Sequence, residues 1–206
     1  MRNFKKDNCV VIKKALNKDV CSFIADYFIL KKQVHQTYLN CGYYKKESQD
    51  FGRYDDPQAV GTYSHYGDIA MDTILKMLKS KVEKATGISL FENYSYARIY
   101  KKGDVLKKHT DRFSCEISAT LNLSGEKWPI FIDYKNNGGD SVTLKQGEML
   151  IYKGCHLPHW REALEEEKCI QVFLHYNDMA APNSLSNKND GRLHLGLPVS
   201  FSKNYG

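Results

Sequence analysis

The chain has 206 residues, of which 42% are hydrophobic, and a formal net charge of +6 from 30 basic and 24 acidic side chains. This length and hydrophobic share are ordinary for one globular domain with a full core. The mean hydropathy of −0.54 and the lack of an apolar run of about 18 residues argue against a membrane protein. The excess of basic residues is modest, so it permits an anionic ligand without predicting nucleic-acid binding.

The N-terminal residues MRNFKKDNCVVIKKAL are basic, but their apolar run is too short for the hydrophobic region of a signal peptide. The six cysteines include no CxxC pair, which favours reduced thiols inside the fold. Both features predict a cytoplasmic protein without a membrane partner.

The first part of the chain contains an extended run and then a helix. The run CVVIKKAL is rich in β-formers and predicts an edge strand. Asn17 is a candidate N-cap. The apolar residues that follow it recur on roughly one face of a helix: Val20, Ile24, Tyr27, Phe28 and Ile29.

Residues 35–66 lack a period and are rich in turn residues, which predicts a long loop containing His35 and His65. Loops of that length usually have a function. A second helix follows, with Asp68 as its N-cap and Gly87 as its terminating glycine.

From residue 88 onward, short β-rich runs are separated by turn signals: YSYARIY, CEISATLNL, WPIFIDY, DSVTL, EMLIY and CIQVFLHY. This pattern predicts a sandwich or barrel, and no βαβ alternation is present. We therefore expect one domain that is mainly β with flanking helices. It would consist of helical support at 15–87, a double-stranded β-helix (jelly roll) at about 88–178 and a polar tail at 179–206.

His109 and Asp111 form an HxD pattern in YKKGDVLKKHTDR. If this segment is a strand, residues two apart project to the same face, so the imidazole and the carboxylate would lie together. Such a pair suits a divalent metal, but the pattern is common by chance and needs a third ligand.

The third candidate ligand lies in GEMLIYKGCHLPHWREAL, where His156 and His159 follow a β-rich run. Two histidines and one carboxylate make the facial triad of non-haem Fe(II) oxygenases. His159 leads the next run, whereas His156 lies inside the turn, so we expect His159 to complete the site.

With these residues, the chain resembles the 2-oxoglutarate and Fe(II)-dependent dioxygenases, specifically their prolyl 4-hydroxylase-like branch. The resemblance covers roughly residues 94–178, and GCHLPHWRE and QVFLHYND are further similar to short oxygenases of phage and marine bacterial genomes. The motif Y-x-x-G…HxD…H…K/R is matched by Tyr100, Gly103, His109, Asp111, His159 and Lys168.

The resemblance implies that His109, Asp111 and His159 hold Fe(II), with 2-oxoglutarate as cosubstrate, O2 as oxidant and ascorbate as a further ligand. It implies hydroxylation of an unactivated C–H, in this branch on a prolyl residue of a peptide or protein. A free amino acid or another small molecule is the first alternative. An AlkB-type nucleic-acid demethylase is less favoured because no arginine follows Arg161 until Arg192. The rival from another class is a non-enzymatic jelly-roll binding protein.

Two basic residues compete for the distal carboxylate of 2-oxoglutarate. Lys168 occupies the family position, nine residues after His159. Arg161 replaces an apolar residue of the family and, along a strand, would share a face with His159. A guanidinium binds a carboxylate with two parallel hydrogen bonds, whereas a lysine acts as a point charge. We favour Arg161, because Lys168 follows three glutamates that are typical of a loop.

Polar and apolar residues alternate in CEISATLNL. On the pattern alone, we interpret its polar face as solvated. The resemblance instead implies that Ser118 and Thr120, together with Tyr100, line the cosubstrate pocket. His175, in QVFLHYND, is predicted to be a strand residue with a structural hydrogen bond.

Overall fold

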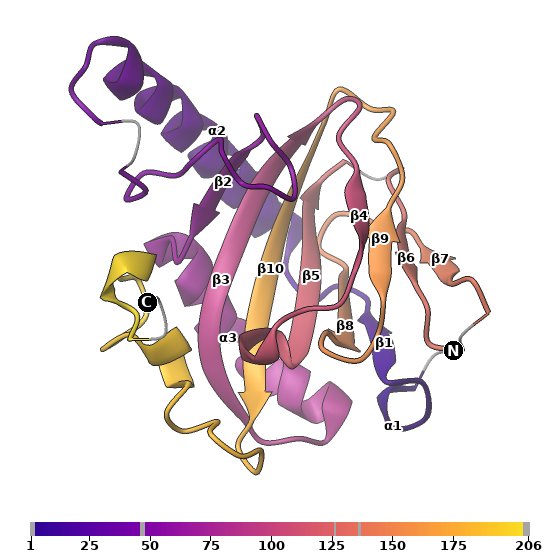
Figure 1. The fold of residues 1–206 in the computed structure, drawn as a ribbon. Helices are drawn as coiled ribbons and strands as arrows, with labels where there is room; N and C mark the ends of the chain where they lie inside the picture. The colour runs from indigo at the N-terminus through magenta and orange to yellow at the C-terminus, as the bar shows by residue number, and fades with distance from the viewer. Residues whose placement is uncertain (1–2, 46–47, 126, 136, 204–206) are drawn as a thin grey trace.

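The computed structural model describes residues 3–45, 48–125, 127–135 and 137–203. Within these ranges, the strands are β1 (Cys9–Ile12), β2 (Tyr63–Tyr66), β3 (Leu90–Lys101), β4 (Leu106–His109), β5 (Ile117–Ser124), β6 (Ile130–Ile132), β7 (Asp140–Val142), β8 (Met149–Lys153), β9 (His159–Arg161) and β10 (Lys168–Asp178). They form two antiparallel sheets (Figure 1). The major sheet has the order β1–β8–β5–β10–β3–β2, and the minor sheet has the order β4–β9–β6–β7. The predicted mainly β jelly roll is confirmed.

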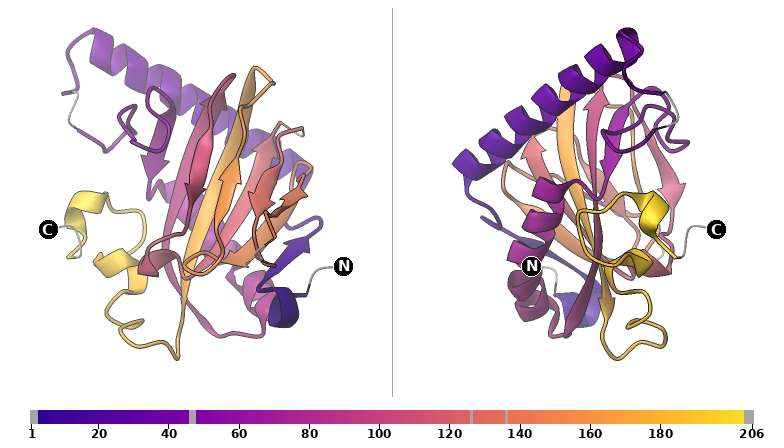
Figure 2. Two further views of the ribbon diagram at one scale, coloured as in Figure 1. Left: turned by 45° about the vertical axis from the view of Figure 1, so that its right-hand side comes forward. Right: turned by 90° about the vertical axis from the view of Figure 1, so that its left-hand side faces the viewer.

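Two long helices lie on the same side of the major sheet (Figure 2). The helical segments are α1 (Phe4–Asp7), α2 (Lys18–Asn40), α3 (Ile69–Thr86) and the 3-10 turns η1 (Phe113–Cys115), η2 (Lys188–Gly191) and η3 (Val199–Phe201). Both predicted N-caps are present: Asn17 accepts from the amide of Asp19 over 2.7 Å, and Asp68 accepts from that of Ala70 over 2.9 Å. Gly87 ends α3 in the left-handed conformation.

The main core lies between these helices and the major sheet. The apolar face of β5 faces the helices with Ile117, Ala119, Leu121 and Leu123. Ile24 and Phe28 of α2 pack in the same core, whereas Val20, at the start of the predicted apolar face, is 40% exposed. The opposite face of β5 consequently points into the space between the two sheets.

The predicted loop at 35–66 was too long at both ends. Helix α2 continues to Asn40 and β2 begins at Tyr63, which leaves 41–62 as the connection. His35 is therefore a buried helix residue, and His65 is a buried strand residue. The ring of His35 stacks on Tyr54 with 5.7 Å between centroids. This packing between residues that are far apart in the sequence stabilises the last turns of α2. The local sequence does not reveal it.

The major sheet also extends beyond the predicted jelly-roll range. Strand β1 forms its edge, as CVVIKKAL predicted, and pairs with β8. Strand β2 forms the opposite edge and pairs with β3, although no strand was predicted there. The tail contains only short 3-10 turns in its described part.

Candidate metal centre

His109 and His159 are direct partners across the minor sheet. Strand β4 ends at His109, β9 begins at His159, and the two residues stand opposite each other in the antiparallel register. Their ring centroids are 4.3 Å apart. This pairing brings together two histidines that are far apart in the sequence.

Each imidazole is held by a backbone carbonyl two residues earlier. Nδ1 of His109 lies 2.8 Å from the carbonyl oxygen of Lys107, and Nδ1 of His159 lies 2.9 Å from that of Leu157. A carbonyl oxygen only accepts, so Nδ1 carries the proton in both rings. The Nε2 lone pairs are then available to a metal, as in histidine ligands whose other nitrogen is fixed by a backbone acceptor.

Asp111 completes the group from the loop that follows β4. Its Oδ1 lies 3.5 Å from Nε2 of His109 and 3.6 Å from Nε2 of His159. The three potential ligand atoms all lie within 4.8 Å of one another. Burial alone would raise the pKa of Asp111, but the neighbouring side chains of His109 and His159 hold it well below its ordinary value, so the carboxylate is ionised.

The route by which His109 and Asp111 meet differs from the prediction. We expected both on one strand, but β4 ends at His109. The amide of Asp111 donates to the carbonyl of Gly154 over 2.9 Å, which ties the loop to the turn after β8. The pair is therefore assembled by a tertiary contact between two loops rather than by the strand period.

A cavity of about 380 Å³ opens in front of the three residues. Its walls come from β3, from the loop at 41–62 and from the strands that carry the histidines. Arg98 lies in this wall and binds Asp56 of the loop over 2.7 Å, and the hydroxyl of Tyr96 also donates to Asp56. Further lining residues include Gln58, Tyr94, Arg112, Tyr152, Phe173 and His175.

Arg161 is a fully buried guanidinium on β9, two residues after His159. One of its nitrogens donates to the carbonyl of Trp128, whose ring lies 4.7 Å from the guanidinium carbon. Its Nε and Nη2 have no hydrogen-bond partner among the described residues. Burial lowers the pKa of Arg161. A buried cation with unsatisfied donors is costly, so this position fits an anionic ligand.

Lys168 does not share the buried position of Arg161. It is the exposed first residue of β10, opposite Lys101 in the register. The next residue, Cys169, is the one that packs against Tyr100 and Trp128 in the interior. Because side chains alternate along a strand, Lys168 points away from the space between the sheets.

The remaining predicted residues are all buried between the sheets. Tyr100 packs edge-on against Trp128 and accepts a hydrogen bond from Arg98. Thr120 donates to Gln171 over 3.1 Å, and Ser118 donates to Oδ2 of Asp111 over 2.7 Å. The solvated interpretation of the polar face of β5 was therefore wrong.

Sequence reasoning missed three residues around the site. Arg98 received no role from the sequence, although it alternates with Tyr96 and Tyr100 in YSYARIY and so shares their face. His175 has the predicted hydrogen bond, but its partner is Ser118, 3.0 Å away and next to Asp111. Burial lowers the pKa of His175 to about 4, so its ring is neutral. Nothing in the sequence pointed to the close packing of Gly154 against Asp111.

Solved structures with a similar fold are known. A Pseudomonas putida prolyl-4-hydroxylase is 13% identical with a TM-score of 0.59, over 84% of this chain and 95% of its own. A viral collagen prolyl hydroxylase from Paramecium bursaria chlorella virus-1, in complex with 2-oxoglutarate, is 11% identical with a TM-score of 0.56, over 82% and 95%. SnoK, a non-haem α-ketoglutarate-dependent carbocyclase of nogalamycin biosynthesis, is 11% identical with a TM-score of 0.60, over 95% and 90%.

The chain has the fold of the 2-oxoglutarate and Fe(II)-dependent oxygenases. At this low identity, the likeness concerns the fold alone. No family model matches the sequence, and no curated protein matches it. The predicted resemblance is confirmed at the level of the fold.

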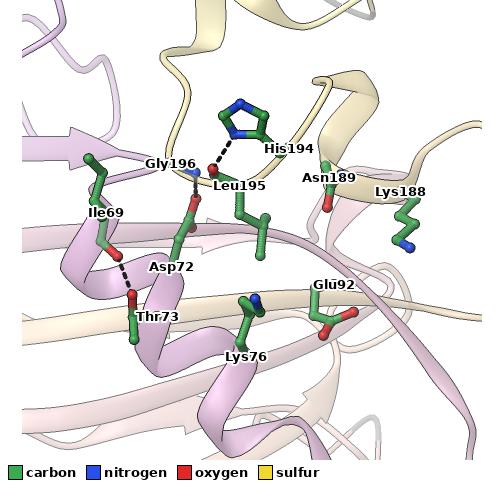
Figure 3. Close-up of a pocket in the computed structure, with 10 residues that line it drawn as sticks. All are labelled: Ile69, Asp72, Thr73, Lys76, Glu92, Lys188, Asn189, His194, Leu195 and Gly196. Carbon is green, nitrogen blue, oxygen red and sulfur yellow. Dashed lines mark hydrogen bonds between the residues drawn. The ribbon is translucent and has the colours of Figure 1, made fainter.

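Part of the tail docks against α3 and β3. Asp72 of α3 accepts from the amide of Gly196 over 2.7 Å (Figure 3) and lies 3.3 Å from Arg192. The hollow between α3, β3 and the tail measures about 400 Å³. In the described part of the chain, no buried side-chain atom that lines this hollow lacks a partner, so it carries no candidate site.

In the described ranges, no helix combines the length and apolar character that a membrane crossing requires.

Proposed function

We propose that the protein is an Fe(II)- and 2-oxoglutarate-dependent dioxygenase that hydroxylates an unactivated C–H bond. The observation that carries this proposal is the convergence of His109, Asp111 and His159 beside a buried, partly unsatisfied Arg161. Two imidazoles and a carboxylate suit Fe(II), and a buried guanidinium with unpaired donors suits the second carboxylate of 2-oxoglutarate.

The residues of the candidate site fit both Fe(II) and 2-oxoglutarate. Nε2 of His109, Nε2 of His159 and Oδ1 of Asp111 would hold the metal, since these atoms face one another. Arg161 would hold the distal carboxylate, because it lies on the same short strand as His159 and has free donors. Lys168 is not assigned this role because its side chain is exposed. Bound Fe(II), with 2-oxoglutarate and O2, would supply the oxidant that converts the C–H bond into an alcohol.

The protein's own contribution is orientation and exclusion of water. The carbonyls of Lys107 and Leu157 fix the two imidazoles with their Nε2 atoms inward. Arg98 and Tyr96 hold Asp56, and with it the adjoining residues Pro57 and Gln58, at the wall of the cavity. Tyr100 and Thr120 are assigned to the wall of the cosubstrate pocket, and Ser118 contacts the ligand Asp111 directly.

We infer a prolyl residue in a peptide or protein as the substrate. The support is the family resemblance, the two prolyl hydroxylases of similar fold and a cavity walled by tyrosines. A free amino acid or other small molecule is the alternative, since a carbocyclase of similar fold shows that this fold carries other chemistry. Ascorbate binding and a cytoplasmic location remain predictions.

Succinate formation from 2-oxoglutarate tests the proposed activity before any substrate is known. The purified chain with Fe(II), 2-oxoglutarate and O2 should form succinate slowly, and Asp111→Ala should not. Proline-containing peptides should accelerate succinate formation and gain a hydroxyl group, whereas free proline should do neither. No succinate from the wild-type chain with any of these additions would contradict the proposal. Acceleration by free amino acids alone would favour the small-molecule alternative.

A further inference from the structure

We propose that Ser118 and His175 are positioning residues that hold Asp111 in the orientation required for metal binding. This inference rests on the proposed function. It starts from the two oxygens of Asp111, which have different partners. Oδ2 accepts a hydrogen bond from Oγ of Ser118 over 2.7 Å. Oδ1 is the atom closest to Nε2 of His109 and of His159, at 3.5 and 3.6 Å.

The direction of the hydrogen bonds around Ser118 follows from its single proton. Oγ lies 2.7 Å from Oδ2 of Asp111, 3.0 Å from the carbonyl oxygen of Cys115 and 3.0 Å from Nδ1 of His175. Of these three atoms, Oδ2 of Asp111 lies nearest to Oγ and is the only charged acceptor, so it takes the hydroxyl proton in the stronger hydrogen bond. Nδ1 of His175 must then carry a proton and donate it to Oγ of Ser118. Hydrogen bonds are therefore donated from His175 to Ser118 and from Ser118 to Asp111.

His175 is fixed in this arrangement from several sides. It stands directly opposite Ser118 in the register of β10 and β5 and is buried. Its ring lies 4.6 Å from that of Tyr94, whose hydroxyl contacts Sγ of Cys115 over 3.0 Å. A histidine held in this way cannot turn to another partner without disturbing the packing of β3. The proton on Nδ1 is therefore kept aimed at Ser118.

Asp111, Cys115 and His175 also offer three potential metal-binding atoms within 4.8 Å of one another. We assign this group to support rather than to a second metal. Nδ1 of His175 is engaged by Ser118, and Sγ of Cys115 is engaged by Tyr94. A metal bound there would also compete for Asp111 with the two histidines at 3.5 and 3.6 Å.

Removing the support should weaken metal binding without removing a ligand. Without the Ser118 hydroxyl, Oδ2 of Asp111 loses its only described side-chain donor, and the carboxylate is free to rotate. Residues that orient metal ligands typically change metal affinity by about 10- to 100-fold when they are replaced. A purely structural role would change the stability of the fold but not the metal affinity of the folded protein.

The test is anaerobic titration of the full chain with Mn(II), a spectroscopic substitute for Fe(II), with the bound and free ion measured by electron paramagnetic resonance. Ser118→Ala and His175→Leu should raise the Kd about 10-fold or more. His175→Asn should stay within about 3-fold of the wild type, because its amide can place an N–H where Nδ1 of the imidazole lies. The spectrum of bound Mn(II) should also change in the first two variants.

Ser95→Ala is the matched control. It removes a similar buried hydrogen bond, from Oγ of Ser95 to Asp72 over 2.6 Å, on the helix-facing side of β3. It should lower the thermal midpoint of the metal-free protein while leaving the Kd for Mn(II) unchanged. Folded Ser118→Ala and His175→Leu proteins with wild-type Mn(II) affinity would overturn the inference. So would a second metal ion per chain that is lost in Cys115→Ala. Absence of metal binding by the wild-type chain would instead contradict the proposed function itself.

Discussion

Gly154 and Asp111 are packed so closely that no side chain fits between them. A Cβ added at Gly154 would lie 2.3 Å from Oδ2 of Asp111 and 2.7 Å from Oγ of Ser118. The carbonyl of Gly154 also accepts from the amide of Asp111. The turn after β8 thus sets the position of the carboxylate ligand.

Gly154→Ala should therefore weaken metal binding. The backbone at Gly154 is not in the left-handed region, so alanine is compatible with it and the effect is steric. Overpacking of this kind costs about 1–3 kcal/mol, and we expect the Kd for Mn(II) to rise about 10-fold or more. Ser95→Ala, which removes a buried hydrogen bond to Asp72 on the helix-facing side of β3, is again the control for a purely structural effect. Unchanged Mn(II) affinity in folded Gly154→Ala would refute this prediction.

Arg161 and Lys168 should differ sharply when each is replaced by methionine. Arg161→Met should lower the affinity for 2-oxoglutarate by about 30-fold or more, since charge-assisted hydrogen bonds contribute about 1.5–3 kcal/mol. Lys168→Met should leave it within about 2-fold, because an exposed point charge contributes little. Isothermal titration of the metal-loaded protein measures both. A larger loss of 2-oxoglutarate affinity in Lys168→Met than in Arg161→Met would assign the distal carboxylate to Lys168.

Arg161→Met also gives an independent readout in the ligand-free protein. An uncompensated buried guanidinium destabilises the fold, so Arg161→Met should raise the thermal midpoint of the ligand-free chain. It should also abolish the increase that 2-oxoglutarate produces in the wild type. A lower midpoint in ligand-free Arg161→Met would indicate that the guanidinium has a structural role instead.

Asp56 should stabilise the loop at 41–62 through its ion pair with Arg98. Asp56→Asn leaves a buried cation without its partner, a change that typically costs about 3–5 kcal/mol. Burial would raise the pKa of Asp56, but the charge of Arg98 and the Tyr96 hydroxyl lower it below the ordinary value of 3.8. A depressed carboxyl pKa gives stability that is present at neutral pH and is lost as the pH falls below about 4. Urea unfolding should therefore show a large difference from wild type at pH 7 that narrows at acid pH, and an equal difference at both would contradict the assignment.

Asp190 should anchor the tail beside the cavity. Both of its carboxylate oxygens accept from Arg112, at 2.9 and 2.7 Å, and the Tyr66 hydroxyl donates to it. Asp190→Asn preserves the size and tolerates the positive φ of 57° at this residue but removes the charge. Limited proteolysis should then cleave the tail faster, while the Kd for Mn(II) stays unchanged. A protected tail in Asp190→Asn would show that the Asp72–Arg192 contact is sufficient.

Much of the fold could be predicted because local patterns and tertiary structure agree there. Strands β3, β5, β8 and β10 are rich in β-forming residues, and Asn17, Asp68 and Gly87 mark helix ends by simple chemistry. Strand β2 is four residues long and lies in a segment without a period, so the sequence did not reveal it. It forms because β3 lies alongside.

The three candidate metal ligands could be predicted from the sequence, but the contacts that position them could not. His109, Asp111 and His159 could be selected from spacing and ligand chemistry. The contact between Asp111 and Gly154, the support from Ser118 and His175, and the burial of Arg161 depend on loops and strands meeting in space. The exposed position of Lys168 likewise follows from the phase of β10, which a shift of one residue would reverse.

The central claim is that His109, Asp111 and His159 bind Fe(II) together with 2-oxoglutarate. Its most direct test is an anaerobic titration of the full chain with Fe(II) in the presence of 2-oxoglutarate, followed by visible absorption. We predict a weak metal-to-ligand charge-transfer band that saturates at one Fe(II) per chain, is absent in Asp111→Ala and requires 2-oxoglutarate. No such band in the folded wild-type protein, or an undiminished band in Asp111→Ala, would contradict the account.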